Sequence, residues 1–520
     1  MYRLGIDVGG TNTDAVIMQG RTVLAGVKTL TTEDVLSGVL EALETAIDRS
    51  GVDREGIAHA MIGTTHFTNA VIERKHLNPV AAIRLGLPAT ACLPPMVDWP
   101  ESLREATGNH TYMVRGGYEF DGSEIAALDT DEIDRIADDI GAKRLPAASI
   151  SSVFSPINSK MEEEARTRLV KKHPKLRVVL SSDIGRIGLL ERENAAIMNA
   201  SLLRLSERTV KAFAKALSSA GLRCAFFITQ NDGTLMAAEM VRKFPVLTFA
   251  SGPTNSMRGA AFLTGRRDAI VVDIGGTTTD IGALRRGFPR QAATVVDIGG
   301  VRTNFRMPDV FSIGLGGGSL VREREDGGVT VGPQSVGYMI TREALVFGGE
   351  TPTATDIAVA LGKAAVGTRP SAAASLDHDF IVKARAEMTA TLERGVERGR
   401  ISPDPIPVIA VGGGSILMPD RLGRLEVIRP ENFAVANAVG AAIAQIGGEV
   451  DRIFSLQNGP TRESCLETAI AEARAKAIRA GAKAETIETI EREDIPLAYL
   501  PGNATRIRVK VIGEMEGLHA

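Results

Sequence analysis

The chain has 520 residues, too many for one ordinary core, because single domains cluster near ~100–200 residues, so two to four domains with a cleft between lobes are expected. Lys plus Arg number 60 against 63 Asp plus Glu, and the resulting net charge of -3 disfavours nucleic-acid binding. No stretch approaches the ~20 consecutive apolar residues that cross a bilayer, so a soluble protein without a membrane partner is expected.

Cysteine usage and the N-terminus both favour a cytoplasmic location. Cys92, Cys224 and Cys465 are far apart and odd in number, which excludes a disulfide framework and a CxxC metal site. From Met1 the sequence passes directly into a predicted strand, without the apolar region of a secretion signal.

The first predicted element is a hairpin. Short apolar runs flank the segment Asp7-Val-Gly-Gly-Thr-Asn-Thr-Asp14, which predicts strand, glycine turn, strand. A Rossmann fingerprint or a P-loop would instead open a helix after its glycines. The segment returns 266 residues later as Asp273-Ile-Gly-Gly-Thr-Thr-Thr-Asp280, identical at six of eight positions. A repeat at this distance predicts one α/β fold duplicated into two facing lobes.

The remaining elements extend this α/β pattern. A possible capping box at Thr31 and Asp34 precedes an amphipathic run through Ile47, and Ser159 with Glu162 begins another helix that stops near Pro174. Further helices are expected near 190–219, 235–243, 433–446 and 462–481, and strands near 224–229, 486–492 and 505–512.

Each glycine turn has the groups that hold a phosphate, because glycines let consecutive backbone N–H groups face one concavity and threonine hydroxyls add donors. Asp7 and Asp273 are hard oxygen ligands suited to Mg2+. One such loop alone could be a tight hairpin whose Asp satisfies its own turn, but two matched copies are stronger evidence. With one copy on each side of a triphosphate, the γ-phosphoryl group could be positioned for in-line transfer, so ATP and Mg2+ are the predicted cofactors.

The predicted site residues follow from these turns. Asp7 and Asp273 are assigned to the metal, and together with Asp14 to catalysis, although Asp14 could equally cap its turn; Asp280 is expected to be structural. The nucleotide is assigned to Gly9, Gly10, Thr11, Asn12, Thr13, Gly275, Gly276, Thr277 and Thr278.

Two later glycine loops, Gly314–Ser319 and Gly412–Ser415, look like strand-to-loop junctions. Gly412, Gly413 and Gly414 are expected to let the backbone approach an adenosine closely. The segment Asp297–Asn304 imitates half of the phosphate motif but lacks its threonine and final Asp, so we interpret it as structural.

Substrate-binding candidates lie in two polar segments. His66 and Asn69 belong to Gly63-Thr-Thr-His-Phe-Thr-Asn69, although a lone His is more often an ordinary hydrogen-bonding residue. Asn231 and Asp232 follow an apolar run, where doubly wound folds place ligand-reading groups, but a simple turn is equally compatible. Arg302 and Arg306 could bind a carboxylate, although surface exposure is the commoner fate of arginine.

The chain resembles the A-type subunits of the ATP-dependent hydantoinase/5-oxoprolinase family from about residue 3 to at least 450. The paired acid loops are shared with the wider actin, sugar-kinase and Hsp70-like superfamily, and further motifs narrow the choice to this family. Four lie between the loops, Gly63–Ala70, Gly116-Gly-Tyr-Glu-Phe-Asp-Gly122, Gln230-Asn-Asp-Gly-Thr-Leu-Met236 and Ser251-Gly-Pro253, and Ile313-Gly-Leu-Gly-Gly-Gly-Ser319 follows the second loop.

The resemblance implies an actin-like ATPase fold of two ribonuclease-H-like lobes, in which ATP phosphorylates a cyclic amide oxygen and so activates the ring for hydrolysis. It also implies that Asp7 and Asp273 match the family's metal-associated acids. Many A subunits carry a histidine just before the last motif, where this chain has Pro308-Asp-Val-Phe-Ser312, so a metal site is not extended to that position. Because the chain is shorter than the usual A subunit, a separate B-type or other hydrolase partner is expected, and little turnover without it.

The expected organisation is an N-terminal lobe segment at 1–185, a second lobe with the ATP-binding core at 186–455, and a small α/β appendage at 456–520. Two other functions stay open: a small-molecule kinase that releases a stable phosphorylated product, and an actin-like ATPase that acts as a chaperone or reactivating factor.

Overall fold

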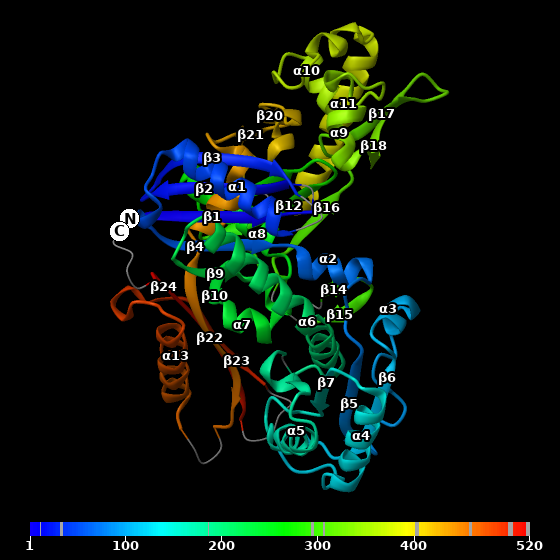
Figure 1. Cartoon of the computed structure of the whole chain (residues 1–520), viewed down its shortest axis with the longest axis vertical. Coiled ribbons are helices and arrows are strands. Elements are labelled where there is room, and N and C mark those ends of the chain that lie inside the picture. Colours follow the sequence, from blue (N-terminus) through cyan, green and yellow to red (C-terminus); the bar gives the residue numbers. More distant parts are fainter. Residues whose placement is uncertain are drawn as a thin grey trace.

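Two mixed sheets form the centre of the molecule, with an α/β unit at one end and a helical extension of the second sheet at the other (Figure 1). The computed structural model describes residues 1–10, 12–31, 35–185, 187–292, 296–304, 307–400, 405–456, 460–497 and 503–515. No helix in these ranges has both the length and the apolar composition that crossing a bilayer requires.

The sheet of the first lobe has nine strands in the order β23-β24-β22-β10-β9-β4-β1-β2-β3. Strands from all three expected segments, 1–185, 186–455 and 456–520, share this sheet. The bounds are β1 Tyr2–Val8, β2 Asn12–Gln19, β3 Thr22–Leu30, β4 Ile57–Thr64, β9 Ala225–Thr229, β10 Thr234–Ala237, β22 Gln445–Phe454, β23 Glu488–Pro496 and β24 Thr505–Gly513.

The sheet of the second lobe repeats the core of the first. Its order is β13-β12-β11-β19-β21-β20, with β16 also pairing β12. β1 pairs β2 antiparallel and β4 parallel, and β11 pairs β12 antiparallel and β19 parallel, so the predicted hairpins and the duplication are confirmed. The bounds are β11 Ala269–Ile274, β12 Thr279–Arg285, β13 Phe288–Pro289, β16 Val310–Ile313, β19 Val408–Val411, β20 Arg421–Leu422 and β21 Leu425–Ile428.

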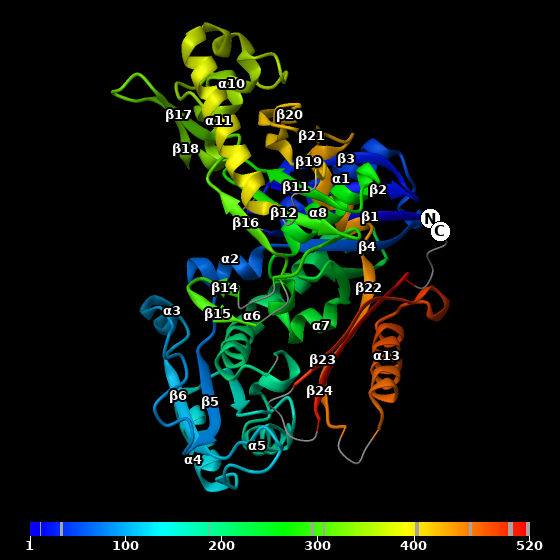
Figure 2. The same cartoon turned by 180° about the vertical axis from the view of Figure 1, so that it is seen from behind.

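Helix α8 (Ser251–Thr264) lies between the two sheets (Figure 2), and α12 (Ala436–Ala442) packs against it. Glycine makes the crossing close, since a Cβ atom at Gly440 would lie 1.8 Å from the Asn255 carbonyl oxygen. A Cβ atom at Gly5 would likewise lie 2.1 Å from the Ala438 carbonyl oxygen, so α12 also packs directly on β1.

The α/β unit is a parallel sheet in the order β6-β5-β7-β8, covered by α4 and α5. The 31-residue helix α6 leads from this unit back to the first lobe, and a buried ion pair between Arg84 of β5 and Glu193 of α6 joins the two. The bounds are β5 Val80–Leu87, β6 His110–Arg115, β7 Ala147–Ser152, β8 Arg177–Leu180, α3 Glu101–Ala106, α4 Thr130–Lys143, α5 Lys160–Lys172 and α6 Leu189–Ser219.

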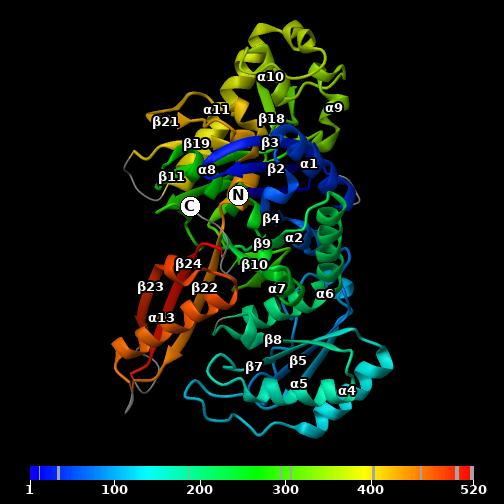
Figure 3. The ribbon, with the colours of Figure 1, turned by 60° about the vertical axis from the view of Figure 1, so that its left-hand side comes forward.

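The other elements surround this frame. Figure 3 shows α13 against strands β22 and β24. The bounds are α1 Val35–Ser50, α2 His66–Glu73, α7 Ala238–Lys243, α9 Ile340–Glu343, α10 Ala354–Ala360, α11 His378–Gly399, α13 Arg462–Arg479, β14 Val296–Ile298, β15 Val301–Thr303, β17 Ser319–Glu323 and β18 Val329–Ser335.

Most predicted elements are confirmed, but several ends differ. The helix expected at 235–243 starts at Ala238, because Thr234–Ala237 pairs with β9 as strand β10. The α-helix expected at 433–446 is shortened to Ala436–Ala442. Ser159 precedes α5 as expected, but its hydroxyl donates to the Glu163 carboxylate instead of capping the helix. Of the proposed Thr31 and Asp34 capping box, Asp34 lies outside the described residues.

Candidate functional site

Both hairpin turns face one cavity of about 390 Å3 between the lobes, within the range of small-molecule sites. Fourteen lining residues belong to the two hairpins and to the loop after β19, or carry charge: Asp7, Gly9, Asn12, Asp14, Lys28, Asp273, Gly275, Gly276, Thr277, Thr278, Asp280, Gly412, Gly413 and Gly414. Gly317 lines the cavity too. The two predicted phosphate turns, 266 residues apart, therefore share a single space.

Three other residues assigned to the first turn are placed differently. Gly10 does not line the cavity, and a Cβ atom there would lie 3.5 Å from the side-chain amide nitrogen of Asn69. Thr13 is buried, with its hydroxyl 3.2 Å from that of Thr31. Thr11 lies outside the described residues.

Asp7 ends β1 as a buried carboxylate, 4% exposed. Asn255 of α8 donates to its Oδ1 at 3.4 Å, and Asn437 of α12 donates to its Oδ2 at 3.3 Å. Burial raises the pKa of Asp7, and the two amides lower it in part because they stabilise the charged form. Gly63 of β4 leaves the room required, since a Cβ atom there would lie 2.2 Å from Oδ1.

Asp14 pairs with a lysine that the motif does not contain. Lys28 Nζ lies 2.5 and 2.7 Å from its two carboxylate oxygens. Burial raises the pKa of Asp14 to about 6, against the opposing effect of Lys28. Sequence reasoning missed Lys28, although Asp14 and Lys28 are direct cross-strand partners in β2 and β3, a pairing that the hairpin register could have revealed.

The second hairpin places Asp273 and Asp280 partly exposed on the other wall. Burial raises the pKa of both, that of Asp280 to about 6, while hydroxyls of Ser256 and Ser312 respectively lower them in part. Gly412 has φ +81°, and a Cβ atom there would lie 2.2 Å from Asp273 Oδ1, so glycine is required where the loop after β19 approaches the acid.

The loop Gly314–Ser319 packs against the second turn and forms backbone hydrogen bonds with it. Gly317 and Gly318 donate backbone hydrogen bonds to the carbonyls of Gly275 and Gly276, at 3.0 and 2.7 Å. A Cβ atom at Gly316 would lie 2.6 Å from the Thr277 nitrogen. This triple glycine therefore fixes the phosphate turn from outside the hairpin.

The charge of the cavity fits a bound divalent cation. Four carboxylates line it, but Lys28 is the only Lys or Arg among its described lining residues. Asn255 Oδ1 and Ser256 Oγ are buried close to Asp7 and Asp273, and neither makes a hydrogen bond of good geometry within the described residues. No group of three or more metal-ligating side chains occurs in those residues, so Mg2+ would take most ligands from water and phosphate, as it commonly does.

His66 and Asn69 lie on α2, and neither lines the cavity. His66 Nδ1 is 2.8 Å from the Thr64 hydroxyl, and burial lowers the pKa of its imidazole. Asn69 donates to the Thr65 hydroxyl at 3.4 Å and lies beside the first turn. Their assignment to substrate stays a prediction.

The segment Gln230–Gly233 also lies outside the cavity lining and packs on α8. Lys510 of β24 forms a buried ion pair with Asp232 at 2.7 Å, which holds the pKa of that carboxyl at about 2 despite burial. The Asn231 carbonyl accepts from Thr254, and the Gly233 carbonyl accepts from Arg258 at 2.6 Å. A substrate role for Asn231 and Asp232 stays a prediction.

The segment Asp297–Asn304 forms the small hairpin of β14 and β15, where Gly299 and Gly300 adopt positive φ. Arg302 lies 3.5 Å from Asp98 on the surface, and Arg306 lies outside the described residues. This hairpin does not line the cavity between the lobes.

Two protein-family models match the sequence of this chain. The model for the hydantoinase/oxoprolinase N-terminal region matches residues 3–173, and the hydantoinase/oxoprolinase model matches residues 192–399. Together they cover more than half of the chain.

Two curated relatives are similar in sequence. The chain is 27% identical to the acetophenone carboxylase gamma subunit of Aromatoleum aromaticum over 69% of this chain and 53% of that protein. It is also 27% identical to caprolactamase subunit alpha of Pseudomonas jessenii, over 85% of this chain and 65% of that protein. The chain thus spans between half and two thirds of the length of these relatives.

Solved structures confirm the predicted actin-like ATPase fold. The ATP-dependent caprolactamase from Pseudomonas jessenii superposes with a TM-score of 0.78 at 20% identity, covering 99% of this chain and 88% of that one. Nucleotide-free acetone carboxylase gives a TM-score of 0.69 at 17% identity, with the same coverage. On the matches of both domain models, the chain belongs to the hydantoinase/oxoprolinase family.

Proposed function

We propose that this chain is the ATP-using subunit of an enzyme that hydrolyses a cyclic amide or imide of hydantoin, oxoproline or lactam type. The observation that carries the proposal is the shared cavity, where two acid-and-glycine hairpins face each other across one space of nucleotide-binding size. Family membership supports it, as does the caprolactamase relative, whose name includes both a subunit and a lactam substrate.

The lining of the cavity favours one orientation of the nucleotide. Asp7, Asp14, Lys28 and Asp273 lie at the two hairpins, where the triphosphate and Mg2+ would be held. Ile340, Phe347, Val366 and Ile416 supply apolar side chains, against which the adenine would pack, and the Gly412–Gly414 loop approaches the space between these two groups.

In the proposed reaction, the amide oxygen of the ring attacks the γ-phosphorus of ATP and ADP leaves. Water then adds to the activated carbon, the C–N bond breaks with the nitrogen taking up a proton, and a second water hydrolyses the acyl phosphate that remains. Overall, the cyclic amide, two waters and one ATP give the ring-opened acid, ADP and phosphate. Lys28 would hold a phosphate oxygen, and the backbone N–H groups of the turns would hold the others, in the positions that in-line transfer requires. Bound Mg2+ would offset the charge that develops on the phosphates.

Asn255 and Asn437 would keep Asp7 ionised and fixed in orientation, one amide for each carboxylate oxygen. Asp14, paired with Lys28, fixes the ammonium at the cavity wall and is a positioning residue in this scheme. The partner expected to complete the enzyme is a separate B-type or other hydrolase subunit, and we place the enzyme in the cytoplasm.

The test combines the purified chain, with and without its candidate partner subunit, with ATP, Mg2+ and a panel of hydantoins and lactams, measuring ADP release and ring opening together. Release of ADP coupled to ring opening supports the proposal. A stable phosphorylated product would instead identify a kinase, and ATPase activity stimulated only by a protein client would identify a reactivating factor.

A further inference from the structure

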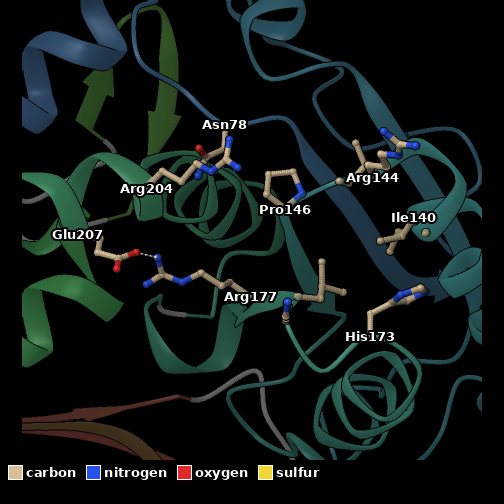
Figure 4. Close-up of a pocket in the computed structure, with 12 residues that line it drawn as sticks. Asn78, Ile140, Arg144, Pro146, His173, Arg177, Arg204 and Glu207 are labelled. Atoms are coloured by element: carbon tan, nitrogen blue, oxygen red, sulfur yellow. Dashed lines mark ion pairs between the residues drawn. The ribbon is translucent and has the colours of Figure 1, made fainter.

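A second cavity, of about 430 Å3, lies between the α/β unit and helix α6 (Figure 4). Its lining comes from the end of α4, the end of α5, the entries to β7 and β8, and the middle of α6. It shares no lining residue with the cavity between the lobes. A ligand bound here would therefore occupy a site separate from that of the proposed nucleotide.

The charge around this cavity is unbalanced. Arg144, Lys175, Arg177 and Arg204 line it, and Glu207 is its only described carboxylate. Glu207 is already shared, because it lies 3.8 Å from Arg177 and 2.8 Å from Lys211. Within the part of the chain that the structure describes, the side chains of Arg144, Lys175 and Arg204 have no carboxylate partner.

The ends of neighbouring helices account for only part of this excess. Cations near a helix C-terminus interact favourably with the helix dipole, and Arg144 directly follows α4 while Lys175 follows α5. Arg177 instead begins β8, and Arg204 lies in the middle of α6, so neither has a helix end to complement. The positive charge of Arg204 is therefore left for another partner, and among the described carboxylates Arg177 has only Glu207, which it shares with Lys211.

Arg177 is held rigidly at the cavity wall. Its guanidinium donates to the carbonyls of Leu203 and Arg242, both at 2.9 Å. Burial lowers the pKa of Arg177 against the attraction of Glu207, and the weaker repulsion of Arg242 lowers it further. An anion in the cavity would relieve this cost, because an opposite charge favours the ionised form.

The same cavity has an apolar surface between the cations. Ile140, Leu145, Pro146 and Leu176 line it, and Figure 4 shows Pro146 between Arg177 and Arg144. Its volume is that of a small-molecule site, too small for a folded partner. A ligand with a charged end and a short hydrocarbon body would match both kinds of surface.

We propose that this cavity binds a small organic oxyanion, a carboxylate or a phosphate on a short apolar skeleton, with Arg204, Lys175 and Arg177 facing its charged group. Charge-assisted contacts from arginine give the affinity and the apolar side chains select for the body of the ligand. Lys175 and Arg204 are exposed and Arg177 is half-buried, so the affinity falls as salt rises.

Calorimetric titration of the full chain at low salt tests the proposal with three probes: adipate, butyl phosphate and inorganic phosphate. Saturable binding of adipate or butyl phosphate, weakened about tenfold by Arg204→Ala and abolished by Arg204→Glu, is the expected result. Arg208→Ala removes a cation one turn further along α6, outside the cavity lining, and should leave the affinity unchanged.

The two organic probes decide between a carboxylate and a phosphate ligand. Binding of inorganic phosphate as tight as that of butyl phosphate would overturn the role of the apolar surface. No saturable binding of any probe up to about 10 mM, or equal binding by the original chain and Arg204→Glu, would overturn the site itself.

Discussion

The two acid hairpins have nearly the same eight residues but different neighbours. In the first lobe, two asparagine amides hold Asp7, and Lys28 pairs with Asp14. In the second, the hydroxyls of Ser256 and Ser312 lower the pKa of Asp273 and Asp280 in part, Lys28 acts on Asp273 only at a distance, and no cation forms an ion pair with either acid within the described residues. The motif therefore determines the backbone and its acids, and the surrounding elements determine what each copy can bind.

This asymmetry suggests that the two lobes contribute differently to the binding of phosphate and metal. The first hairpin has an ammonium suited to a phosphate oxygen, and the second has less compensated acids and a turn supported by three glycines. We expect the first lobe to contribute more to phosphate affinity and both lobes to contribute to the metal. Five predictions would sharpen or break this comparison.

The largest effect is expected at the paired acids. Asp7→Asn and Asp273→Asn should each reduce ATP turnover by about 10²–10³-fold, because each removes a negative charge from the metal site while keeping the size of the side chain. Turnover measured alongside thermal unfolding separates chemistry from folding. Undiminished turnover in either variant would show that the two hairpins do not act on one nucleotide.

Lys28→Met should weaken ATP binding by about tenfold to a hundredfold, because it removes one charge-assisted hydrogen bond to a phosphate oxygen. The second lobe has no lysine in the equivalent position among its described cavity residues. Calorimetric binding constants provide the measurement. Lys363→Met is the matched control, because this lysine pairs with Asp420 on the surface and does not line the cavity. Equal ATP affinities for the original chain and Lys28→Met would contradict the larger contribution of the first lobe to phosphate binding.

The pH dependence of stability compares Asp14 with Asp280. Each carboxyl has a pKa of about 6 in the folded protein against an ordinary value of 3.8, so the folded state keeps protons that the unfolded state has released. The free energy of unfolding without ligand should therefore fall as pH rises from 3.8 to about 6. Asp14→Asn or Asp280→Asn should each flatten this fall in urea titrations; an unchanged slope would contradict the raised pKa.

Magnesium-dependent nucleotide binding should change in the opposite direction with pH. Asp14 and Asp280 gain protons as the pH falls through about 6, which removes negative charge from the cavity. The affinity for Mg·ADP should therefore weaken below that pH. Affinity that is constant from pH 7 to 5 would show that the charges of Asp14 and Asp280 do not contribute to the binding of Mg·ADP.

The smallest effects should arise on α8, where adjacent residues face different lobes. Asn255→Ala should lower the free energy of unfolding by about 1–2 kcal/mol, since it removes donors to Asp7 and Thr229. Ser256→Ala should cost less than about 0.5 kcal/mol, because its hydroxyl makes no well-formed hydrogen bond within the described residues.

Asn199→Ala is the matched control for this pair. Asn199 is also buried and also makes two hydrogen bonds, but it binds the backbone at Lys243 and Val246, away from the cavity. It should lose comparable stability with no loss of nucleotide affinity. A Ser256→Ala cost larger than that of Asn255→Ala would reverse the comparison of the two lobes.

Local sequence patterns were sufficient for the hairpins, the duplication and the long helix α6. The apolar periodicity and the paired glycines that predict these features are local signals, because the residues that form each pattern lie a few positions apart in the chain. The segment Thr234–Ala237 was misassigned to a helix because its strand pairing with β9 and β22 is a tertiary contact that local periodicity does not reveal.

The neighbours of the site were harder to predict for a related reason. Asn255 and Asn437 meet Asp7 from 248 and 430 residues away, across helices that come together because glycines allow it. Lys510 reaches Asp232 over 278 residues, from a segment that looked like a separate appendage. Single-sequence reasoning finds residues that share a motif, and it does not find residues that share only a location.

The most direct test of the shared nucleotide is a double-mutant cycle on Mg·ADP affinity, with Asp7→Asn, Asp273→Asn and the double variant. If both hairpins hold one magnesium nucleotide, the loss in the double variant will differ from the sum of the two single losses by at least about 0.5 kcal/mol. Strictly additive losses, or Mg·ADP affinity that neither substitution changes, would contradict the account.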